Sequence, residues 1–285
     1  MGEKTSLCID LGSTKIEICR IAPTGEICSR TRFSTATLEP GSPDFLERVS
    51  VLIETHLSHS DQKLGVSWNA PIHHERLTYS TLLGGECDVN FGTFFRQRFA
   101  LEVQVESDVH AMALGEFRFG SGPGSAPFVF VNLGSGSGFA FHDGVQLMRG
   151  YQGCAGLVCH EKRMVSEIGE PVIMDNLLSG RGLSLLYRKI AGETISAHEV
   201  VDRLPDDSLA QRALSILGHH LGHFMTTLAR FFNPRSIILG GSVSCAHQHF
   251  LPVALETMSE HIERMCRPEK VFVSEIEAPA CRGLS

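Results

Sequence analysis

Two glycine-rich turns of nearly the same composition lie about 120 residues apart in this chain. Residues 10–15 read Asp-Leu-Gly-Ser-Thr-Lys and residues 132–138 read Asn-Leu-Gly-Ser-Gly-Ser-Gly, and each turn separates two apolar, β-rich runs. Glycine lets the backbone approach a ligand closely, and successive N–H groups in such a turn attract phosphate. One such turn is weak evidence, but two of them, each within a β-hairpin, predict a clamp that closes on a polyphosphate from two sides.

Length, charge and cysteine usage narrow the class of protein. The chain has 285 residues, enough for one or two domains with a large core, and its formal net charge of −7 argues against nucleic acid as the main partner. No apolar run reaches the roughly 18 residues of a membrane span, and no cleavable apolar segment precedes the first strand, so we expect a cytoplasmic protein. The nine cysteines form no C-x-x-C pair, and we expect reduced core thiols.

The pattern of hydrophobic residues predicts an α/β protein in which a similar order of elements occurs twice. The Gly/Ser/Pro stretch at 120–125 is the best linker candidate, and we divide the chain into domains 1–117 and 118–285. A hairpin turn is expected at Asp143-Gly144. The predicted elements are three strands within 6–35, a helix at 43–59, strands at 64–68 and 102–106, helices at 90–99 and 109–117, a second β meander from 128, helices within 178–231, a strand at 236–242, a helix at 248–265 and a strand at 270–276.

The glycine turns match neither of the two common phosphate-binding loops. The G-x-G around Gly134 would need a helix directly after it in a dinucleotide-binding fold, but Phe139 and Phe141 predict a strand there. A Walker A loop, G-x-x-x-x-G-K-[ST], is absent from the sequence. The hairpin clamp therefore remains the better interpretation of the two turns.

Asp108 is the first candidate catalytic residue. It lies where a predicted strand ends and a helix begins, the position at which α/β folds place their chemistry. The same position suits a helix N-cap, and the two roles are compatible. Further along, a buried strand ends in Gly240 and Gly241. These glycines either let a flat ligand approach the backbone or form a simple turn.

Five segments carry a family likeness, in order and at family-like spacing. They lie at 10–15, 106–116, 133–138, 153–160 and 233–241. Together they resemble the motifs of the ROK family, which comprises bacterial repressors and sugar kinases, and the resemblance covers nearly the whole chain. It implies an α/β fold of two actin-like (ribonuclease H-like) domains around a cleft for nucleotide and sugar.

The resemblance also implies ATP and Mg²⁺ as cofactors, a small-molecule sugar as the partner and a homodimer as the default assembly. Asp108 would be the general base that takes a proton from the sugar hydroxyl, and Asp10 would hold Mg²⁺ directly or through water. The residues implied to bind the nucleotide are Gly12, Ser13, Thr14, Lys15, Gly134, Ser135 and Gly136 at the phosphates, and Gly240 and Gly241 near the adenosine.

The departures from the family pattern cluster on the sugar side. Ser107 stands where the family has Asn, and Leu157 replaces a Glu, although the His three residues later is kept as His160. The cysteines of the family's zinc motif are absent, so no zinc site is expected. We therefore predict an altered sugar pocket, formed by Thr81, Ser107, Asp108, Gly156, Leu157, His160 and Asp175.

The prediction is an ATP-dependent kinase that phosphorylates a hydroxyl of a hexose or of an amino or N-acetyl hexose. Two alternatives remain: a non-catalytic sugar or metabolite sensor with the same fold, and an actin-like ATPase that acts without sugar. ROK repressors carry a DNA-binding helix-turn-helix at the N-terminus, for which residues 1–6 leave no room, so a repressor is not expected.

Two groups of metal-ligating residue types fall outside these motifs. His219 and His223 have the i,i+4 spacing of a metal-binding pair, but they equally suit a polar helix face, and the Glu of H-E-x-x-H is missing. Cys154, Cys159 and His160 fall short of a closed four-ligand zinc shell.

Overall fold

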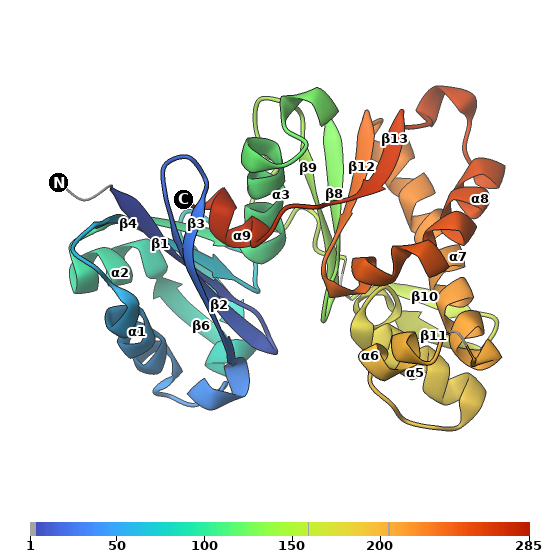
Figure 1. Ribbon diagram of the computed structural model, residues 1–285, viewed down its shortest axis with the longest axis horizontal. Helices are drawn as coiled ribbons and strands as arrows, with labels where there is room; N and C mark the ends of the chain where they lie inside the picture. Colours follow the sequence, from blue (N-terminus) through green and yellow to red (C-terminus); the bar gives the residue numbers. More distant parts are fainter. Residues whose placement is uncertain (1–3, 159, 205) are drawn as a thin grey trace. The chain divides into compact units, whose positions relative to one another are not determined.

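The computed structural model of the protein describes residues 4–158, 160–204 and 206–285. They form two compact units, each with its own sheet and core (Figure 1). The first unit contains the chain up to residue 124 together with 147–155 and 275–285, and the second contains 125–146 and 156–274. The sequence predicts a single division of the chain, after residue 117, but the later segments 147–155 and 275–285 pack with the N-terminal unit.

The first unit is built on a five-stranded sheet with the strand order β3-β2-β1-β4-β7. Strands β1, β4 and β7 are parallel to one another, while β2 and β3 continue the sheet as an antiparallel meander from β1. The elements are β1 (Thr5–Leu11), β2 (Lys15–Ile21), β3 (Ile27–Ser34), β4 (Asp61–Trp68), β7 (Glu102–Ser107), the small hairpin β5 (Arg76–Ser80) and β6 (Gly85–Asn90), and helices α1 (Phe45–His56), α2 (Phe91–Phe99), α3 (Asp108–Phe119) and α9 (Pro279–Gly283).

Strand β1 shows why both faces of this sheet are covered. Leu7, Ile9 and Leu11 belong to one apolar core with α1 and α2, whereas Cys8 belongs to a second core with α3 and α9. Successive side chains of a strand point to opposite faces, so apolar residues on both faces require a helix layer on each side. Burial of this kind stabilises by about 25 cal/mol for each Å² of apolar surface removed from water.

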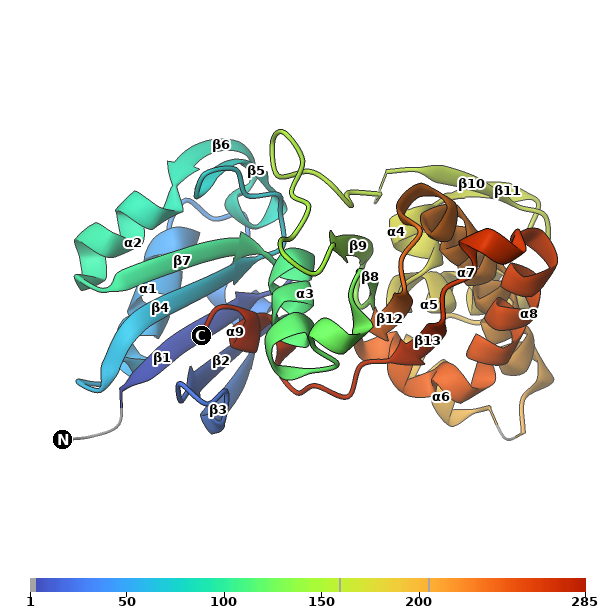
Figure 2. The same cartoon turned by 90° about the horizontal axis from the view of Figure 1, so that it is seen from above.

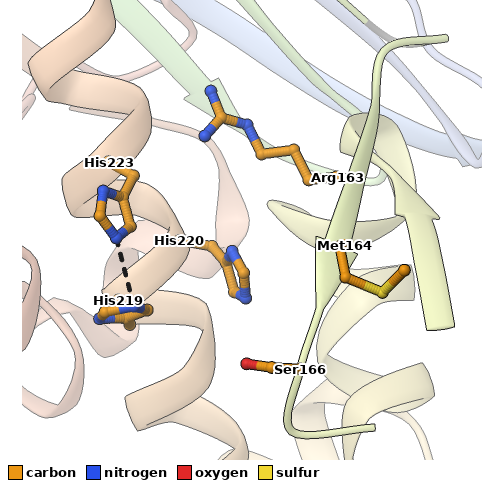
Figure 3. A pocket seen from close by; sticks show the side chains of 6 residues that line it. All are labelled: Arg163, Met164, Ser166, His219, His220 and His223. Atoms are coloured by element: carbon orange, nitrogen blue, oxygen red, sulfur yellow. Dashed lines mark hydrogen bonds between the residues drawn. The ribbon is translucent and has the colours of Figure 1, made fainter. Parts of the chain in front are cut away.

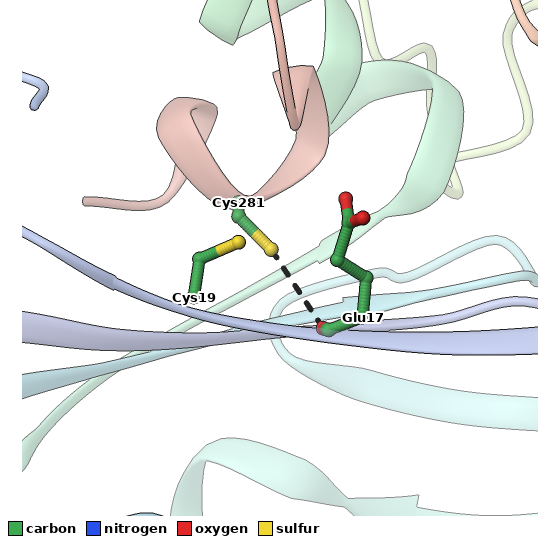
Figure 4. Close-up of side chains that lie close together, drawn as sticks. All are labelled: Glu17, Cys19 and Cys281. Carbon is green, nitrogen blue, oxygen red and sulfur yellow. Dashed lines mark hydrogen bonds between the residues drawn. The ribbon is translucent and has the colours of Figure 1, made fainter. Parts of the chain in front are cut away.

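The short helix α9 lies beside α3 and closes the second face (Figure 2). A methyl group at Gly283 would lie 1.9 Å from the carbonyl oxygen of Ala111, so the two backbones are in direct contact and only glycine fits there. From the same helix, the thiol of Cys281 reaches the carbonyl oxygen of Cys8 at 3.7 Å. It also reaches the carbonyl oxygen of Glu17 at 3.8 Å (Figure 4). The C-terminal segment is therefore an integral part of the first core.

The second unit is built on a four-stranded sheet with the order β13-β12-β8-β9, in which β8, β12 and β13 are parallel and β9 is antiparallel to β8. Its core joins Val129, Val131 and Leu133 of β8 to the apolar face of the long helix α7. The elements are β8 (Phe128–Leu133), β9 (Ser137–His142), β10 (Lys162–Val165), β11 (Glu170–Ile173), β12 (Ser236–Gly240), β13 (Lys270–Val273), α4 (Met174–Leu177), α5 (Gly180–Ala191), α6 (Ala197–Asp202), α7 (Ser208–Phe232) and α8 (Leu251–His261).

The two units repeat one topology. The order β2-β1-β4-β7 of the first sheet corresponds to β9-β8-β12-β13 of the second, with the same parallel and antiparallel pairings. The glycine turns join β1 to β2 and β8 to β9, and therefore occupy equivalent positions. The repeat of organisation predicted from the sequence is confirmed.

Some sequence predictions were wrong in detail. Asp143 caps a turn by accepting hydrogen bonds from the N–H groups of Val145 and Gln146, but no second strand follows, because the hairpin already turns at 134–136. Of the eight described cysteines only Cys8, Cys19 and Cys281 are buried, so most are not core thiols.

No helix among the described residues is both long and apolar enough to cross a membrane.

Candidate active site

The carboxyl ends of three parallel strands bring the polar residues of the first unit together. In the register of the sheet, Asp10 of β1 pairs with Ser67 of β4, and Ser67 pairs with Glu106 of β7. Strand β7 ends at Ser107, which is buried, and Asp108 follows at once as the first residue of α3. Asp10 and Asp108, far apart in the sequence, thus lie at one edge of one sheet, where α/β folds place their ligands.

Both carboxyl groups are held in an environment that disfavours their charge. Asp10 is 9% exposed, and burial raises its pKa to about 6, although the hydroxyl of Ser67 donates a hydrogen bond of 2.5 Å to it. Burial, and next the charge of Asp10, raise the pKa of Asp108 to about 7. Its Oδ1 accepts a hydrogen bond of 2.8 Å from the N–H of Val109. Asp108 is not the N-cap that its position suggested, because α3 already begins at Asp108; the N-cap residue is Ser107, whose side chain makes no capping hydrogen bond.

The first glycine turn presents its backbone and side chains to solvent beside this edge. The N–H of Gly12 donates to the carbonyl oxygen of Lys15 at 3.0 Å, which closes the turn. Thr35 stabilises the turn, because its hydroxyl donates a hydrogen bond of 2.8 Å to the carbonyl oxygen of Gly12. Ser13, Thr14 and Lys15 are exposed. A lysine and a tight turn at a strand end suit a phosphate group.

The equivalent turn of the second unit is closed in the same way, by the N–H of Gly134 donating to the carbonyl oxygen of Gly136 at 3.0 Å. Asp175 supports this turn: its Oδ1 accepts from the N–H of Ser137 at 2.9 Å, and its Oδ2 pairs with Arg181. A methyl group at Gly136 would lie 2.2 Å from Asp175 Oδ1, so a larger residue there would displace the Asp175 carboxylate. Ser135, between the two glycines, is half-buried.

Gly240 and Gly241 lie at the end of β12, next to this turn. Gly240 pairs in register with Asn132, and Gly241 has a φ of +87°, which glycine adopts readily. A methyl group at Gly241 would lie 2.5 Å from Asn132 Oδ1. That oxygen is buried and has no hydrogen-bond partner among the described residues. Asn132 is the positional counterpart of Asp10 in the repeated topology, a signal that the sequence analysis missed.

The sequence also did not predict a charged cluster near Asp108, formed by Glu106, His110 and Arg149. Glu106, only 4% exposed, accepts from Arg149 Nε at 2.7 Å and lies 3.4 Å from His110 Nδ1. Burial opposes its ionisation, but His110 and Arg149 hold the pKa of Glu106 below its usual value. His110 Nε2 bonds the carbonyl oxygen of Ala155 at 3.0 Å. These contacts fasten the segment 147–155 to the start of α3.

The residues expected on the sugar side are divided between the units. In the first unit, Thr81 is exposed and begins the 3₁₀ helix η2 (Thr81–Leu83). The preceding Ser80 is buried, and its hydroxyl accepts from the indole N–H of Trp68 at 2.9 Å. The strand that ends at Trp68 is the neighbour of the strand that ends at Ser107, so this corner adjoins the Asp108 edge.

In the second unit, Gly156 has a φ of +93°, and its carbonyl oxygen accepts from the N–H of Phe139 at 3.3 Å. A methyl group on Gly156 would lie 1.8 Å from the carbonyl oxygen of Phe139, so only glycine fits. Leu157 is 53% exposed, and His160 is exposed. Cys159, considered above as a metal ligand, lies outside the described residues.

Comparison with known proteins accords with this arrangement. The model of the ROK family matches residues 6–281. A glucokinase of Halalkalibacterium halodurans is 24% identical over 301 residues, which cover 92% of this chain and 90% of that protein.

Among solved structures, the ROK family glucokinase from Streptomyces griseus in complex with glucose and AMPPNP superposes with a TM-score of 0.83 at 22% identity, covering 98% of this chain and 97% of that one. A ROK family transcriptional regulator, a homologue of the E. coli MLC protein, has the same TM-score at 19% identity, covering 99% and 76%. These likenesses confirm the actin-like α/β fold.

Proposed function

Because the chain belongs to the ROK family, we propose that it is an ATP-dependent sugar kinase that phosphorylates a hydroxyl of a hexose or of an amino or N-acetyl hexose. The observation that carries the proposal is the pair of carboxyl groups, Asp10 and Asp108, at the carboxyl edge of one parallel sheet. Burial raises the pKa of both groups, and the charge of Asp10 raises that of Asp108 further, as is common for carboxyl groups at functional sites. Such a pair suits a metal-assisted phosphoryl transfer.

Asp108 is proposed as the general base. A base works best when its pKa lies near the operating pH, and a pKa of about 7 meets that condition. At neutral pH an ionised Asp108 would accept the proton of the sugar hydroxyl as that oxygen bonds to the terminal phosphorus of ATP and the bond from that phosphorus to ADP breaks. A base of this kind contributes about 10²–10⁴-fold to the rate. The Val109 N–H holds the carboxylate in one orientation.

ATP and Mg²⁺ are the proposed cofactors, and the residues present fit both. Asp10 offers a buried carboxylate oxygen, the ligand type that Mg²⁺ prefers, directly or through water. Bound Mg²⁺ neutralises charge on the transferred phosphoryl group. The N–H groups of the two glycine turns and the ammonium group of Lys15 are proposed to bind the phosphates, and Gly240 and Gly241 to border the adenosine. The buried Asn132 oxygen gives this corner an unused hydrogen-bond acceptor.

The sugar pocket is proposed to differ from that of a glucose kinase with the full family motif. An exposed apolar side chain, Leu157, stands where the family has an acidic one. The proposed substrate therefore lacks, or does not require, the polar group that this acid would bind. Ser107, Thr81 and His160 remain proposed sugar contacts. Asp175 does too, and its bonds to Ser137 and Arg181 would fix its orientation.

The same departure at Leu157 favours one other candidate, a sugar-binding sensor without catalysis. The two candidates differ in what Asp108 does. In a kinase its removal slows phosphoryl transfer by about 10²-fold or more, whereas in a sensor it alters binding alone. We further propose a homodimer of 31.2 kDa chains, the state that the family resemblance implies. Sedimentation equilibrium at the monomer mass would overturn that assignment.

The test is an ADP-release assay with Mg-ATP and a panel of hexoses, 2- and 3-amino hexoses and N-acetyl hexoses. We expect release that depends on one class of sugar and that falls by about 10² or more in Asp108→Asn. Asp44→Asn is the matched control, because Asp44 is an exposed carboxylate of the same unit whose side chain makes no capping bond. Sugar and nucleotide binding without any release would replace the kinase by the sensor.

A further inference from the structure

A pocket of about 360 Å³ lies in the second unit, between helix α7 and the β10–β11 hairpin (Figure 3). Three histidines of α7 line one wall, and Arg163, Met164 and Ser166 line the other. None of these residues takes part in the proposed kinase reaction. The three histidines are His219, His220 and His223.

Two of these histidines have the geometry of a chelating pair. His219 Nε2 and His223 Nε2 are 3.3 Å apart, with the rings nearly perpendicular at 89°. Two imidazole ligands at about 2.0 Å from one tetrahedral ion stand roughly 3.3 Å apart, so the separation already fits a shared ion. A hydrogen bond between two neutral imidazoles has a similar length. The 3.3 Å separation therefore fits both a shared ion and a hydrogen bond, and the contacts of the two rings with neighbouring residues distinguish these arrangements.

The neighbouring helix α8 supports the metal-binding arrangement. His219 Nδ1 lies 3.3 Å from the hydroxyl of Thr257, which is 4% exposed. A metal-bound histidine almost always donates its second ring N–H to such a partner, which leaves the lone pair on the other nitrogen. His261 donates Nδ1–H to the carbonyl oxygen of Thr257 at 2.8 Å, because a carbonyl only accepts. The lone pair of His261 is therefore on Nε2, and its ring lies 4.6 Å from that of His223, centre to centre.

His220 provides separate evidence that the pocket binds a ligand. It is 7% exposed, and its Nε2 has no hydrogen-bond partner among the described residues. Glu167 Oε2 lies 3.7 Å from His220 Nε2, too far for a hydrogen bond. A buried polar atom without a partner is unfavourable, and a water molecule on a bound ion would give it one.

We propose that His219 and His223 bind a divalent transition-metal ion through Nε2, with His220 and His261 beside it and water in the open positions. Imidazole ligands select zinc, nickel, copper or cobalt, whereas Mg²⁺ and Ca²⁺ require oxygen. The site is separate from the Mg²⁺ proposed at Asp10 and does not depend on kinase activity.

The test uses the full chain, without a polyhistidine tag and stripped with a chelator, titrated calorimetrically with Zn²⁺ and with Ni²⁺. Wild type is expected to bind one ion more than the double variant His219→Gln, His223→Gln, and to gain thermal stability that the double variant does not gain. His59→Gln is the matched control, because it removes an exposed histidine of the first unit and leaves this ion bound. Millimolar Mg²⁺ is expected not to compete.

Thr257→Val separates metal binding from a structural role of the histidines. It removes the hydroxyl beside His219 and keeps the shape, so the affinity for Zn²⁺ should fall by about 10–100-fold while the fold is retained. Equal stoichiometry and affinity in wild type and double variant would overturn the proposal, as would displacement by Mg²⁺. If circular dichroism shows that the double variant does not fold, His223→Gln alone is judged by the same criteria.

Discussion

Replacing Asp108 by asparagine is expected to stabilise the protein at alkaline pH. In the folded chain the pKa of Asp108 is about 7, against 3.8 for an unperturbed aspartate, because burial and the neighbouring Asp10 disfavour its charge. The folded state therefore holds the proton more tightly than the unfolded state. The stability associated with this group is fully present below about pH 4 and is lost as the pH rises to about 7.

The size of the effect follows from the difference between the two pKa values. At roughly 1.4 kcal/mol for each pH unit, a difference from 3.8 to about 7 sets an upper bound of about 4 kcal/mol. Asp108 is partly exposed, and solvent screening reduces the effect, so we expect about 1–3 kcal/mol. Asparagine has the same shape and no charge. The variant should therefore exceed wild type by this amount at pH 8 and match it near pH 4.

The assay is urea unfolding at pH 4.5 and pH 8, in the presence of a chelator and without nucleotide. The chain has one tryptophan, Trp68, which is fully buried in the same unit as Asp108, so its fluorescence reports the unfolding of that unit. Asp44→Asn should change neither midpoint. An Asp108→Asn variant no more stable than wild type at pH 8, or equally stabilised at both pH values, would refute the electrostatic reasoning.

Three further substitutions probe the surroundings of the site. Gly136→Ala places a methyl group 2.2 Å from Asp175 Oδ1, so it should weaken Mg-ATP binding in calorimetry and lower the free energy of unfolding by about 1–3 kcal/mol. Arg149→Met leaves Glu106 with one fewer partner and should lower the free energy of unfolding by about 1–3 kcal/mol at pH 7. Because the pKa of Glu106 is lowered in the folded state, that loss should shrink below about pH 4.5. Leu157→Glu should tighten glucose binding by about 10–100-fold, measured as KM, if its carboxylate accepts a hydrogen bond from the sugar.

Each of these three substitutions has a control. Gly124→Ala adds a methyl group that meets no atom within 4 Å and should leave nucleotide binding unchanged. Arg149→Lys keeps a positive charge near Glu106 and should recover part of the stability. Leu157→Gln supplies a neutral group, so an equal gain with glutamine and glutamate would exclude a charged hydrogen bond. Unchanged affinity in Gly136→Ala would remove that turn from the nucleotide site.

Local patterns in the sequence were sufficient to predict most of the secondary structure. The β-rich run before the first glycine turn predicted β1, because such runs bounded by turns are typical of strands, and the apolar spacing in 43–59 predicted α1, because helices repeat their buried face every 3.6 residues. The position of Asp108 between a strand and a helix also followed from pattern alone. Its neighbour at the sheet edge, Asp10, was identified through the family motif, and the register of β1, β4 and β7 supplied the physical reason.

The sequence by itself determined the two β-rich repeats, their glycine turns and the family to which the chain belongs. These properties are encoded within short windows, where periodicity and turn chemistry act. Only the tertiary structure decided that Arg149 reaches Glu106, that Asp175 supports the turn at Gly136, and that Thr257 lies beside His219. Each of these contacts joins segments far apart in the chain, and it forms because two packed layers bring their side chains together. Sequence spacing within one segment does not indicate such a long-range contact. For this reason the buried partners of the site were identified only in the tertiary structure.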